Sequence, residues 1–464
     1  MFAAHVHADR RQRLLDSVPG PLLFVGHGER PRNLPANAVP FRQDSTFWYL
    51  TGCALPDAAL WLEDGRAELY LPVPGEEDAL WHGPTPPPEA LRDRYGVDAV
   101  LPLHALPGRL QGRSVRTLAV ADAARTAELA RWTGQALAFG REHGDPELVQ
   151  AVIALRRTKG PEELDSLRRV AALTARAHVL TMAATRPGIT ERALTAVFEA
   201  CLASHGAVPG YATILTQDGQ VLHHHGHEGT CTEGRLLLLD GGGEWEADGY
   251  GADLTRTWPV SGRFTSRQRS AYEAVLAAQE AAIARCRAGV RYREVHDAAC
   301  LVLARWLIDE GLLRGLGPDE AVERGAHALF FPHGIGHLLG LDVHDLENFG
   351  DLPAYPPGQG RPEAFGTRNL RLDLPLEPGW VVTIEPGFYV VPEILGQPAL
   401  RDRFRHVLDL DAVAAWAGFG GIRIEDDVVI TAGLPEVLTE AAPKAVAAVE
   451  AAVGVGTTLE ALLA

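Results

Sequence analysis

The sequence predicts an α+β protein with two domains, an α/β domain at the N-terminus and a larger mixed domain after it. Short β-prone runs separated by turn residues fill residues 41–73. An apolar helical periodicity begins after Gly160, and strand-like runs alternate with long helical segments beyond residue 210. A chain of 464 residues is long enough for two or three domains of roughly 100–200 residues each. We place the domains at 1–157 and 158–464.

The N-terminal domain is predicted from turn residues that divide apolar runs. Residues 41–73 hold aromatic and aliphatic runs broken by Gly, Pro and Asp, a pattern typical of strands in a mixed sheet. Helices around 87–95 and 122–142 would cover this sheet. The N-terminal domain is therefore expected to be α/β.

The second domain is expected to begin with a helix. Gly160 breaks the preceding pattern, and Pro161 suits the first turn of a helix. Glu162 and Glu163 would then lie at the positive end of the helix dipole. Apolar residues recur every three positions, at Leu164, Leu167, Val170 and Leu173.

The rest of this domain is expected to be α+β. A second helix follows Pro187 and Gly188, with Thr190 as its cap. Strand-like runs occupy residues 211–217, 235–242, 252–260, 380–391 and 421–431. Further helices are expected near 266–288, 291–311 and 435–452. The Pro- and Gly-rich segment 350–366 is expected to be a surface loop.

The composition restricts the classes of function. Lys and Arg number 43 against 60 Asp and Glu, which gives a net charge of −17. This excess opposes binding to nucleic acids and anionic membranes, and no apolar stretch reaches the roughly 18 residues of a membrane span. We therefore expect a cytoplasmic protein that binds neither. The five cysteines form no CxxC pair, so neither a zinc cage nor a disulfide framework is indicated.

Four acidic residues stand at the ends of apolar strand-like runs. Asp240 follows LLLL, and Asp253 opens DLTRTWPV. Glu385 follows WVVTI, and Glu425 follows GIRI. Alternation along GIRIE places Arg423 and Glu425 on one face of the strand. One acid at a strand end is usually solvated, whereas four of them near several histidines predict a binding site.

The segment HGIGHLLGLDVHD, residues 333–345, supplies the histidines. They are His333, His337 and His344. Glycines between them allow the backbone to pass close to a ligand. The pattern is not HExxH, which excludes the helical arrangement of that class of zinc protease. Three histidines so close together favour a site over isolated core residues.

This donor set predicts metal-assisted hydrolysis. One imidazole and four carboxylates form an oxygen-rich set, which favours Mn²⁺, with Zn, Co or Fe as alternatives. The ligands suffice for two divalent metal ions per chain. Such a pair, roughly 3.5–4 Å apart, holds a bridging water, lowers its pKa and stabilises the oxyanion formed at a carbonyl. No GxSxG, P-loop or known Cys nucleophile motif occurs, so other classes of catalysis lose support.

These motifs resemble the M24 metallopeptidases of pita-bread fold, in the branch of aminopeptidase P and prolidase. FRQDSTFWYLTG resembles the creatinase/aminopeptidase P-like N-terminal domain. LDGGGEWEADGYGADLTRTWPVSGRFT, HGIGHLLGLDVHD, TIEPGFY and GIRIEDD resemble the successive catalytic motifs. The resemblance implies a pita-bread catalytic domain and hydrolysis of Xaa-Pro peptides. It implies that the dimetal ligands are Asp240, Asp253, His337, Glu385 and Glu425, with Asp253 and Glu425 bridging.

The resemblance also carries one departure. Asp240 and Asp253 lie 13 positions apart, about two more than is usual in the family. A longer turn would absorb the difference. His223, 17 positions before Asp240, matches a family histidine near the substrate's proline.

Besides His223, five residues of these catalytic motifs have implied catalytic or substrate-binding roles. Glu385 is expected to act as the general base. His333 and His344 match histidines that contact the substrate and stabilise the tetrahedral intermediate. Arg423 matches the arginine beside the last glutamate, and Tyr389 matches the tyrosine after EPG.

Two substrate classes stay open within this branch, an aminopeptidase that acts on longer Xaa-Pro peptides and a dipeptidase that cleaves only Xaa-Pro. FRQDSTFWYLTG and Trp81 resemble bacterial aminopeptidase P. The insertion 346–371, the stretch 390–418 and Arg371, 14 positions before Glu385, resemble prolidase, in which an arginine binds the dipeptide carboxylate. We favour the aminopeptidase. Trp81 resembles a residue that reaches a neighbouring active site, which implies a homo-oligomer, either a dimer or a tetramer.

Alternatives on the same fold are disfavoured. A non-catalytic binding protein or a metal-free enzyme like creatinase would lack ligands, whereas all five ligand positions are present here. Methionine aminopeptidase lacks a comparable N-terminal domain.

Overall fold

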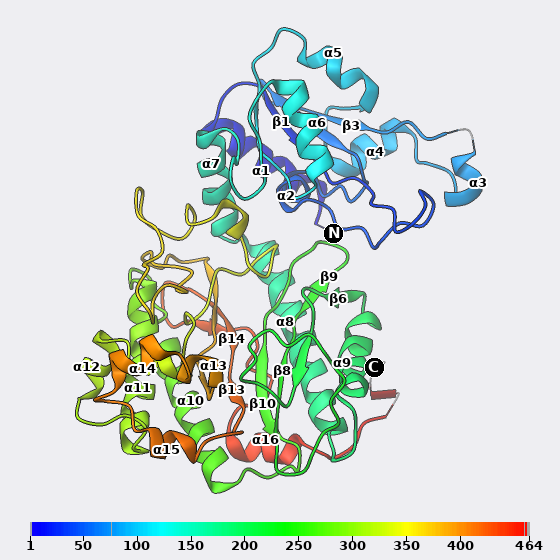
Figure 1. Cartoon of the computed structure of the whole chain (residues 1–464). Helices are drawn as coiled ribbons and strands as arrows, with labels where there is room; N and C mark the ends of the chain where they lie inside the picture. The colour runs from blue at the N-terminus through cyan, green and yellow to red at the C-terminus, as the bar shows by residue number, and fades with distance from the viewer. Residues whose placement is uncertain (1, 76, 459, 462–464) are drawn as a thin grey trace. The chain divides into compact units, whose positions relative to one another are not determined.

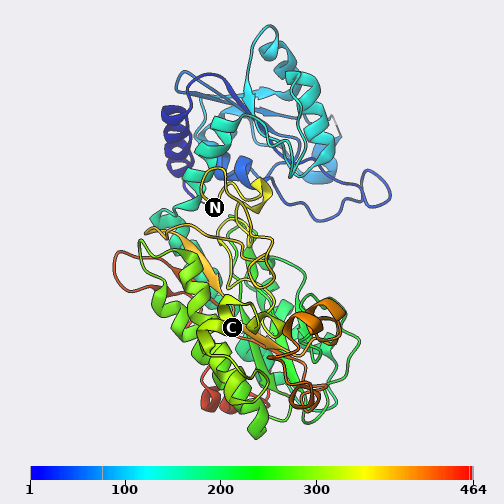
Figure 2. The same cartoon turned by 60° about the vertical axis from the view of Figure 1, so that its left-hand side comes forward.

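The computed structural model describes residues 2–75, 77–458 and 460–461. These residues form two compact units (Figures 1 and 2). The first unit comprises Met1–Arg157 with Leu346–Pro353, and the second comprises Thr158–Asp345 with Ala354–Ala464. A short segment from the middle of the chain therefore belongs to the N-terminal unit.

The first unit is built on a mixed five-stranded sheet with the order β4-β3-β2-β1-β5. Its strands are β1 (Leu22–Val25), β2 (Ala59–Glu63), β3 (Arg66–Leu71), β4 (Ala99–Pro102) and β5 (Arg116–Thr117). β2 pairs antiparallel with β1 and β3, whereas β4 and β5 pair parallel with β3 and β1. Leu23, Val25 and Trp61 contribute to its buried core. The mixed sheet agrees with the prediction.

The helices of this unit partly correct the prediction. They are α1 (Ala4–Ser17), α2 (Ser45–Thr51), α3 (Asp78–His82), α4 (Pro88–Tyr95), α5 (Leu106–Leu110), α6 (Ala123–Thr133) and α7 (Pro146–Arg157). The strand expected at the start of 41–73 is wrong, because the Asp44 carboxylate accepts a hydrogen bond from Phe47 N and caps α2. The helix expected over 122–142 ends early, because Gly134 adopts a left-handed conformation with φ of 69°.

Two helix pairs lie on either side of the strands of the second unit (Figures 1 and 2). α8 (Pro161–Ala184) packs on α9 (Glu191–Ala203), and α10 (Ser266–Arg285) packs on α11 (Tyr292–Asp309). The Glu163 carboxylate accepts a hydrogen bond from Gly160 N at 2.9 Å, and Thr190 Oγ1 accepts one from Ala193 N at 3.2 Å. These contacts confirm the predicted starts of α8 and α9.

The strands between the helix pairs form small antiparallel sheets. One contains β7 (Ile214–Thr216), β8 (Leu236–Asp240) and β10 (Thr255–Pro259) in the order β10-β8-β7. Another contains β11 (Val381–Ile384), β14 (Asp426–Val429) and β15 (Glu436–Val437) in the order β11-β14-β15. β12 (Gly387–Tyr389) pairs with β13 (Gly421–Arg423), and β6 (Ala207–Pro209) pairs with β9 (Gly243–Trp245). The α+β class and each expected strand region are confirmed.

The C-terminal part departs from the prediction. The helix expected over 435–452 is shorter, because β15 uses its first residues and α16 spans only Val446–Ala452. Pro443 lacks the backbone N–H that a longer helix would need. Shorter helices are α12 (Pro318–Glu323), η2 (His327–Leu329), α13 (Pro392–Leu395), α14 (Pro398–Phe404) and α15 (Leu410–Ala414). Among the described helices, none is long and apolar enough to cross a membrane.

Candidate metal centre and active site

The return from β8 to β10 brings Asp240 and Asp253 together. The two strands pair antiparallel, with Asp240 opposite Thr255. The chain between the aspartates closes tightly at Gly242, where a Cβ would collide with the carbonyl of Ala252. Glycine is required at this close approach. Both carboxylates therefore lie at one end of the sheet, even though 13 positions separate them.

Glu385 and Glu425 reach the same point from a second sheet. Glu385 directly follows β11 and Glu425 directly precedes β14, and these strands pair with Ile384 opposite Asp426. Glu425 N donates to the Thr255 carbonyl at 3.0 Å, which joins the second sheet to β10. The Thr255 hydroxyl also donates to Glu425 Oε2 at 2.7 Å. The four acids thus converge.

His337 lies between these acids. A Cβ at Gly336 would collide with the Thr383 carbonyl, so glycine allows this loop to cross β11 closely. His337 Nε2 lies 3.4 Å from Asp253 Oδ2 and 3.8 Å from Glu385 Oε1. Three overlapping groups have potential ligand atoms within 4.8 Å of one another: Asp253–His337–His344, His337–Glu385–Glu425 and Asp240–Asp253–Glu425.

The centre buries several negative charges. Asp240, Asp253 and Glu425 are all buried. Burial and the neighbouring carboxylates raise the pKa of Glu425 well above its ordinary value, and burial raises the pKa of Glu385 to about 7. Burial also opposes ionisation of Asp253, but the hydrogen bond and charge of His337 lower the pKa of that carboxyl. Clustered buried carboxylates need cations, and oxygen ligands suit hard divalent ions, so these residues fit a metal pair.

Arg423, Tyr389 and His333 form a hydrogen-bonded chain beside the acids. Arg423 Nη2 donates to Asp240 Oδ2, and Arg423 Nη1 donates to the Tyr389 hydroxyl at 3.0 Å. His333 Nδ1 lies 2.8 Å from the Gly334 carbonyl and must donate to it. His333 Nε2 then accepts from the Tyr389 hydroxyl at 2.9 Å. Burial lowers the pKa of His333 to about 3, so its ring is neutral.

A cavity of about 450 Å³ opens onto the centre. The predicted residues that line it are His223, His333, His337, His344, Arg371, Arg423 and the four acids. The ring of His344 stacks on that of His337, with centroids 4.0 Å apart. Tyr389 is buried and reaches the site through its hydrogen bonds. Trp81 belongs to the first unit, where it lies on α3 with 71% of its side chain exposed.

Tyr211 is a site residue that the sequence did not indicate. Its hydroxyl lies 2.6 Å from Asp240 Oδ1 and also hydrogen-bonds to Asp253. Burial raises the pKa of this hydroxyl well above its ordinary value, so it remains a donor. Tyr211 precedes β7, whose Ile214 lies opposite Asp240. The position of Tyr211 beside the acids follows only from the pairing of β7 with β8, which the sequence did not give.

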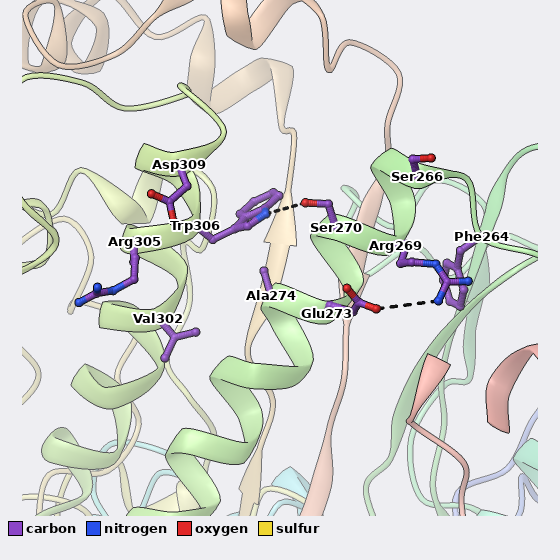
Figure 3. A pocket seen from close by; sticks show the side chains of 10 residues that line it. All are labelled: Phe264, Ser266, Arg269, Ser270, Glu273, Ala274, Val302, Arg305, Trp306 and Asp309. Carbon is purple, nitrogen blue, oxygen red and sulfur yellow. Dashed lines mark hydrogen bonds and ion pairs between the residues drawn. The ribbon is translucent and has the colours of Figure 1, made fainter. Parts of the chain in front are cut away.

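A larger concavity of about 540 Å³ lies on the face shared by α10 and α11 (Figure 3). Its charged side chains alternate in sign, as in the ion pair of Arg269 with Glu273. Trp306 Nε1 donates to the Ser270 hydroxyl at 3.0 Å within it. None of the predicted site residues lines this concavity, so cavity size does not locate the site.

The chain belongs to metallopeptidase family M24, which matches residues 165–432. Residues 7–118 match the N-terminal domain of aminopeptidase P. A probable Xaa-Pro aminopeptidase of Ajellomyces capsulatus is 33% identical over 462 residues, covering 96% of this chain and 95% of the relative. A probable Xaa-Pro aminopeptidase of Neosartorya fischeri is 32% identical over 473 residues, covering 97% of each chain.

Solved structures of aminopeptidases are similar over the same length. The structure of Pseudomonas aeruginosa aminopeptidase PepP has a TM-score of 0.81 and 31% identity, covering 97% of this chain and 98% of that one. Zinc-substituted Escherichia coli aminopeptidase P in complex with product has a TM-score of 0.80 and 30% identity, with the same coverage. The pita-bread and aminopeptidase P-like fold expected from the sequence is confirmed.

Proposed function

We propose that this protein is an Xaa-Pro aminopeptidase, which hydrolyses the bond between an N-terminal residue and a following proline. The observation that carries the proposal is the convergence of four carboxylates and His337 from two sheets at one cavity. Family membership and the full-length match to Xaa-Pro aminopeptidases support the substrate class.

We propose that two divalent metal ions, Mn²⁺ by preference, bind in this centre. Asp253 and Glu425 would contact both ions, with His337 and Glu385 completing one coordination set and Asp240 the other. When bound, such ions polarise the scissile carbonyl and lower the pKa of water. Their charge would compensate the buried carboxylates, since burial and the neighbouring carboxylates together raise the pKa of Glu425.

The chain's own residues would supply proton transfer and orientation. Glu385 is the general base, because its carboxylate lines the cavity among the proposed metal ligands. His344 lies beside His337 and donates a hydrogen bond to the developing oxyanion. Neutral His333 contacts the substrate while Tyr389 fixes its orientation. Arg423 holds Asp240 in place.

Arg371 favours a second candidate, a dipeptidase. Its side chain lines the cavity together with Arg361, and a guanidinium there would bind the carboxylate of an Xaa-Pro dipeptide. His223 also lines the cavity, and it would contact the proline in either candidate enzyme. The aminopeptidase has the stronger support, because the full-length relatives named above are aminopeptidases.

The test is hydrolysis of Gly-Pro, Ala-Pro and an Xaa-Pro-Xaa peptide in the presence of Mn²⁺. Release of the first residue from the longer peptide supports the aminopeptidase, whereas cleavage confined to the dipeptides would establish the dipeptidase. Metal analysis is a second check. Fewer than about one bound divalent ion per chain would contradict the hydrolase proposal.

We also propose that the chain forms a dimer or tetramer in which the exposed Trp81 reaches the cavity of a neighbouring copy. Sedimentation analysis gives the oligomeric state. Trp81→Ala should raise KM for the longer peptide while kcat for a dipeptide changes little. A monomer with full activity would contradict this proposal.

A further inference from the structure

Two imidazoles and a thiol meet in the core of the second unit, away from the acidic centre. His296 and Cys300 are one turn apart on α11, and His327 begins η2. Their side chains are buried, with exposed fractions of 1%, 0% and 2%. One potential ligand atom from each residue lies within 4.8 Å of the others. The three residues therefore form a compact cluster.

An unsatisfied nitrogen in this cluster points to a ligand. His327 Nδ1 lies 3.4 Å from the Ala321 carbonyl, but His327 Nε2 is buried and has no hydrogen-bond partner among the described residues. A buried polar atom without a partner costs about 1–3 kcal/mol. Coordination to an ion would satisfy this nitrogen.

The geometry of the cluster suits a tetrahedral metal ion. Metal–sulfur and metal–nitrogen bonds of about 2.3 and 2.0 Å, at a tetrahedral angle, place the two ligand atoms about 3.5 Å apart. His296 Nε2 lies 3.4 Å from Cys300 Sγ. Little movement is needed for both atoms to bind one ion.

The protonation states of the two histidines also suit a metal ligand set. Burial lowers the pKa of His296 to about 3 and that of His327 to about 4, so both rings are neutral, the form that binds metals. Burial raises the pKa of the Cys300 thiol well above its ordinary value. Metal binding would therefore release the thiol proton to solvent as the metal–sulfur bond forms.

We propose that His296, Cys300 and His327 form a zinc site that is separate from the acidic centre. A thiolate and two imidazoles favour Zn²⁺, whereas the oxygen-rich centre favours Mn²⁺, so the two sites select different ions. The ring of His296 contacts Phe331 at 5.6 Å between centroids, and Phe331 packs edge-on against His333 at 4.8 Å. A bound zinc would hold α11 and η2 together, and Phe331 would connect this zinc site to His333.

Cobalt substitution tests the proposal, because Co²⁺ bound to a thiolate has a charge-transfer band in the near ultraviolet and the acidic centre offers no thiolate. The full-length chain is produced with Co²⁺ supplied during synthesis, since the ligand atoms are buried. We expect this band, and about one cobalt ion more per chain than in Cys300→Ala, whose band should be absent.

Cys286→Ala is the matched control, because Cys286 is an equally buried cysteine whose thiol hydrogen-bonds only to a backbone carbonyl of its own helix in the described chain. It should retain both the band and the cobalt content. Absence of the band from the unsubstituted protein would overturn the proposal without reference to any variant. Equal cobalt content in the unsubstituted protein and Cys300→Ala would overturn it as well.

Discussion

Glu425 and Asp426 are adjacent in the chain and both buried, yet they lie in opposite environments. Asp426 accepts hydrogen bonds from Arg256 Nη2 at 2.7 Å and Lys444 Nζ at 2.6 Å. Burial opposes the ionisation of Asp426, but these two cations lower its pKa to about 2. Glu425 instead lies beside other carboxylates, and its pKa is raised.

The difference separates a structural acid, Asp426, from an acid of the proposed metal centre, Glu425. Alternation along an extended chain sends neighbouring side chains to opposite faces, so one strand serves both regions. On the Asp426 face the protein supplies the compensating cations itself. On the Glu425 face Arg423 contacts Asp240, and the remaining negative charge requires cations from outside.

Removal of metal should therefore produce the largest effect. After treatment with a chelator we expect activity to fall to background and the free energy of unfolding to decrease. The decrease should be about 2.7 kcal/mol if the ion had been present at 100 times its dissociation constant. Thermal unfolding and a peptide cleavage assay check this, and added Mn²⁺ should restore both. Unchanged stability and activity after verified metal removal would show that the Glu425 side needs no external cations.

Glu385→Ala should lower kcat by roughly 100- to 10,000-fold, because this residue is both the proposed general base and a proposed metal ligand. The measurement is steady-state cleavage of an Xaa-Pro peptide, with metal content determined in parallel. Glu377→Ala, a change at an exposed acid before β11, is the matched control and should leave kcat unchanged. Normal turnover by Glu385→Ala with both metals bound would remove Glu385 as the base.

Asp426→Asn tests the structural side of the comparison. Removing this charge leaves Arg256, which is completely buried, without its partner carboxylate, and should cost about 3–5 kcal/mol of unfolding free energy. Denaturant unfolding measures the loss. Asp165→Asn, in the exposed pair of Arg169 with Asp165, should cost no more than about 0.5 kcal/mol. Similar costs for the two variants would mean that burial does not distinguish the pairs.

The proposed ligand residues were predictable from the sequence because the four acids stand at the ends of short apolar runs and His337 lies in a glycine-rich segment with two other histidines. Their convergence required the resemblance to a family, since no local pattern fixes which strands pair. Tyr211 was missed for that reason, because its contact with Asp240 depends on the pairing of β7 with β8. The cluster of His296, Cys300 and His327 also joins residues from separate elements.

Errors in the fold arose where local signals competed. The run STFWYLT is rich in β-prone residues, but Asp44 and Gly52 cap it at both ends and it folds as α2. Residues 435–452 read as helix because they are rich in alanine, whereas pairing with β14 converts the first of them to a strand. In both cases caps or tertiary pairing outweighed residue propensity.

The smallest effect is expected from Tyr211→Phe, which changes a hydrogen bond on the Glu425 side without removing a charge. The Tyr211 hydroxyl orients the carboxylates of Asp240 and Asp253, so its loss should weaken Mn²⁺ binding by roughly 10- to 100-fold. Isothermal titration of the metal-free protein with Mn²⁺ gives this change. Tyr272→Phe removes a buried hydroxyl that donates to the Lys444 carbonyl on the Asp426 side, and it should leave Mn²⁺ affinity unchanged. If both variants lost affinity equally, the two faces of the Glu425–Asp426 pair would be coupled rather than independent.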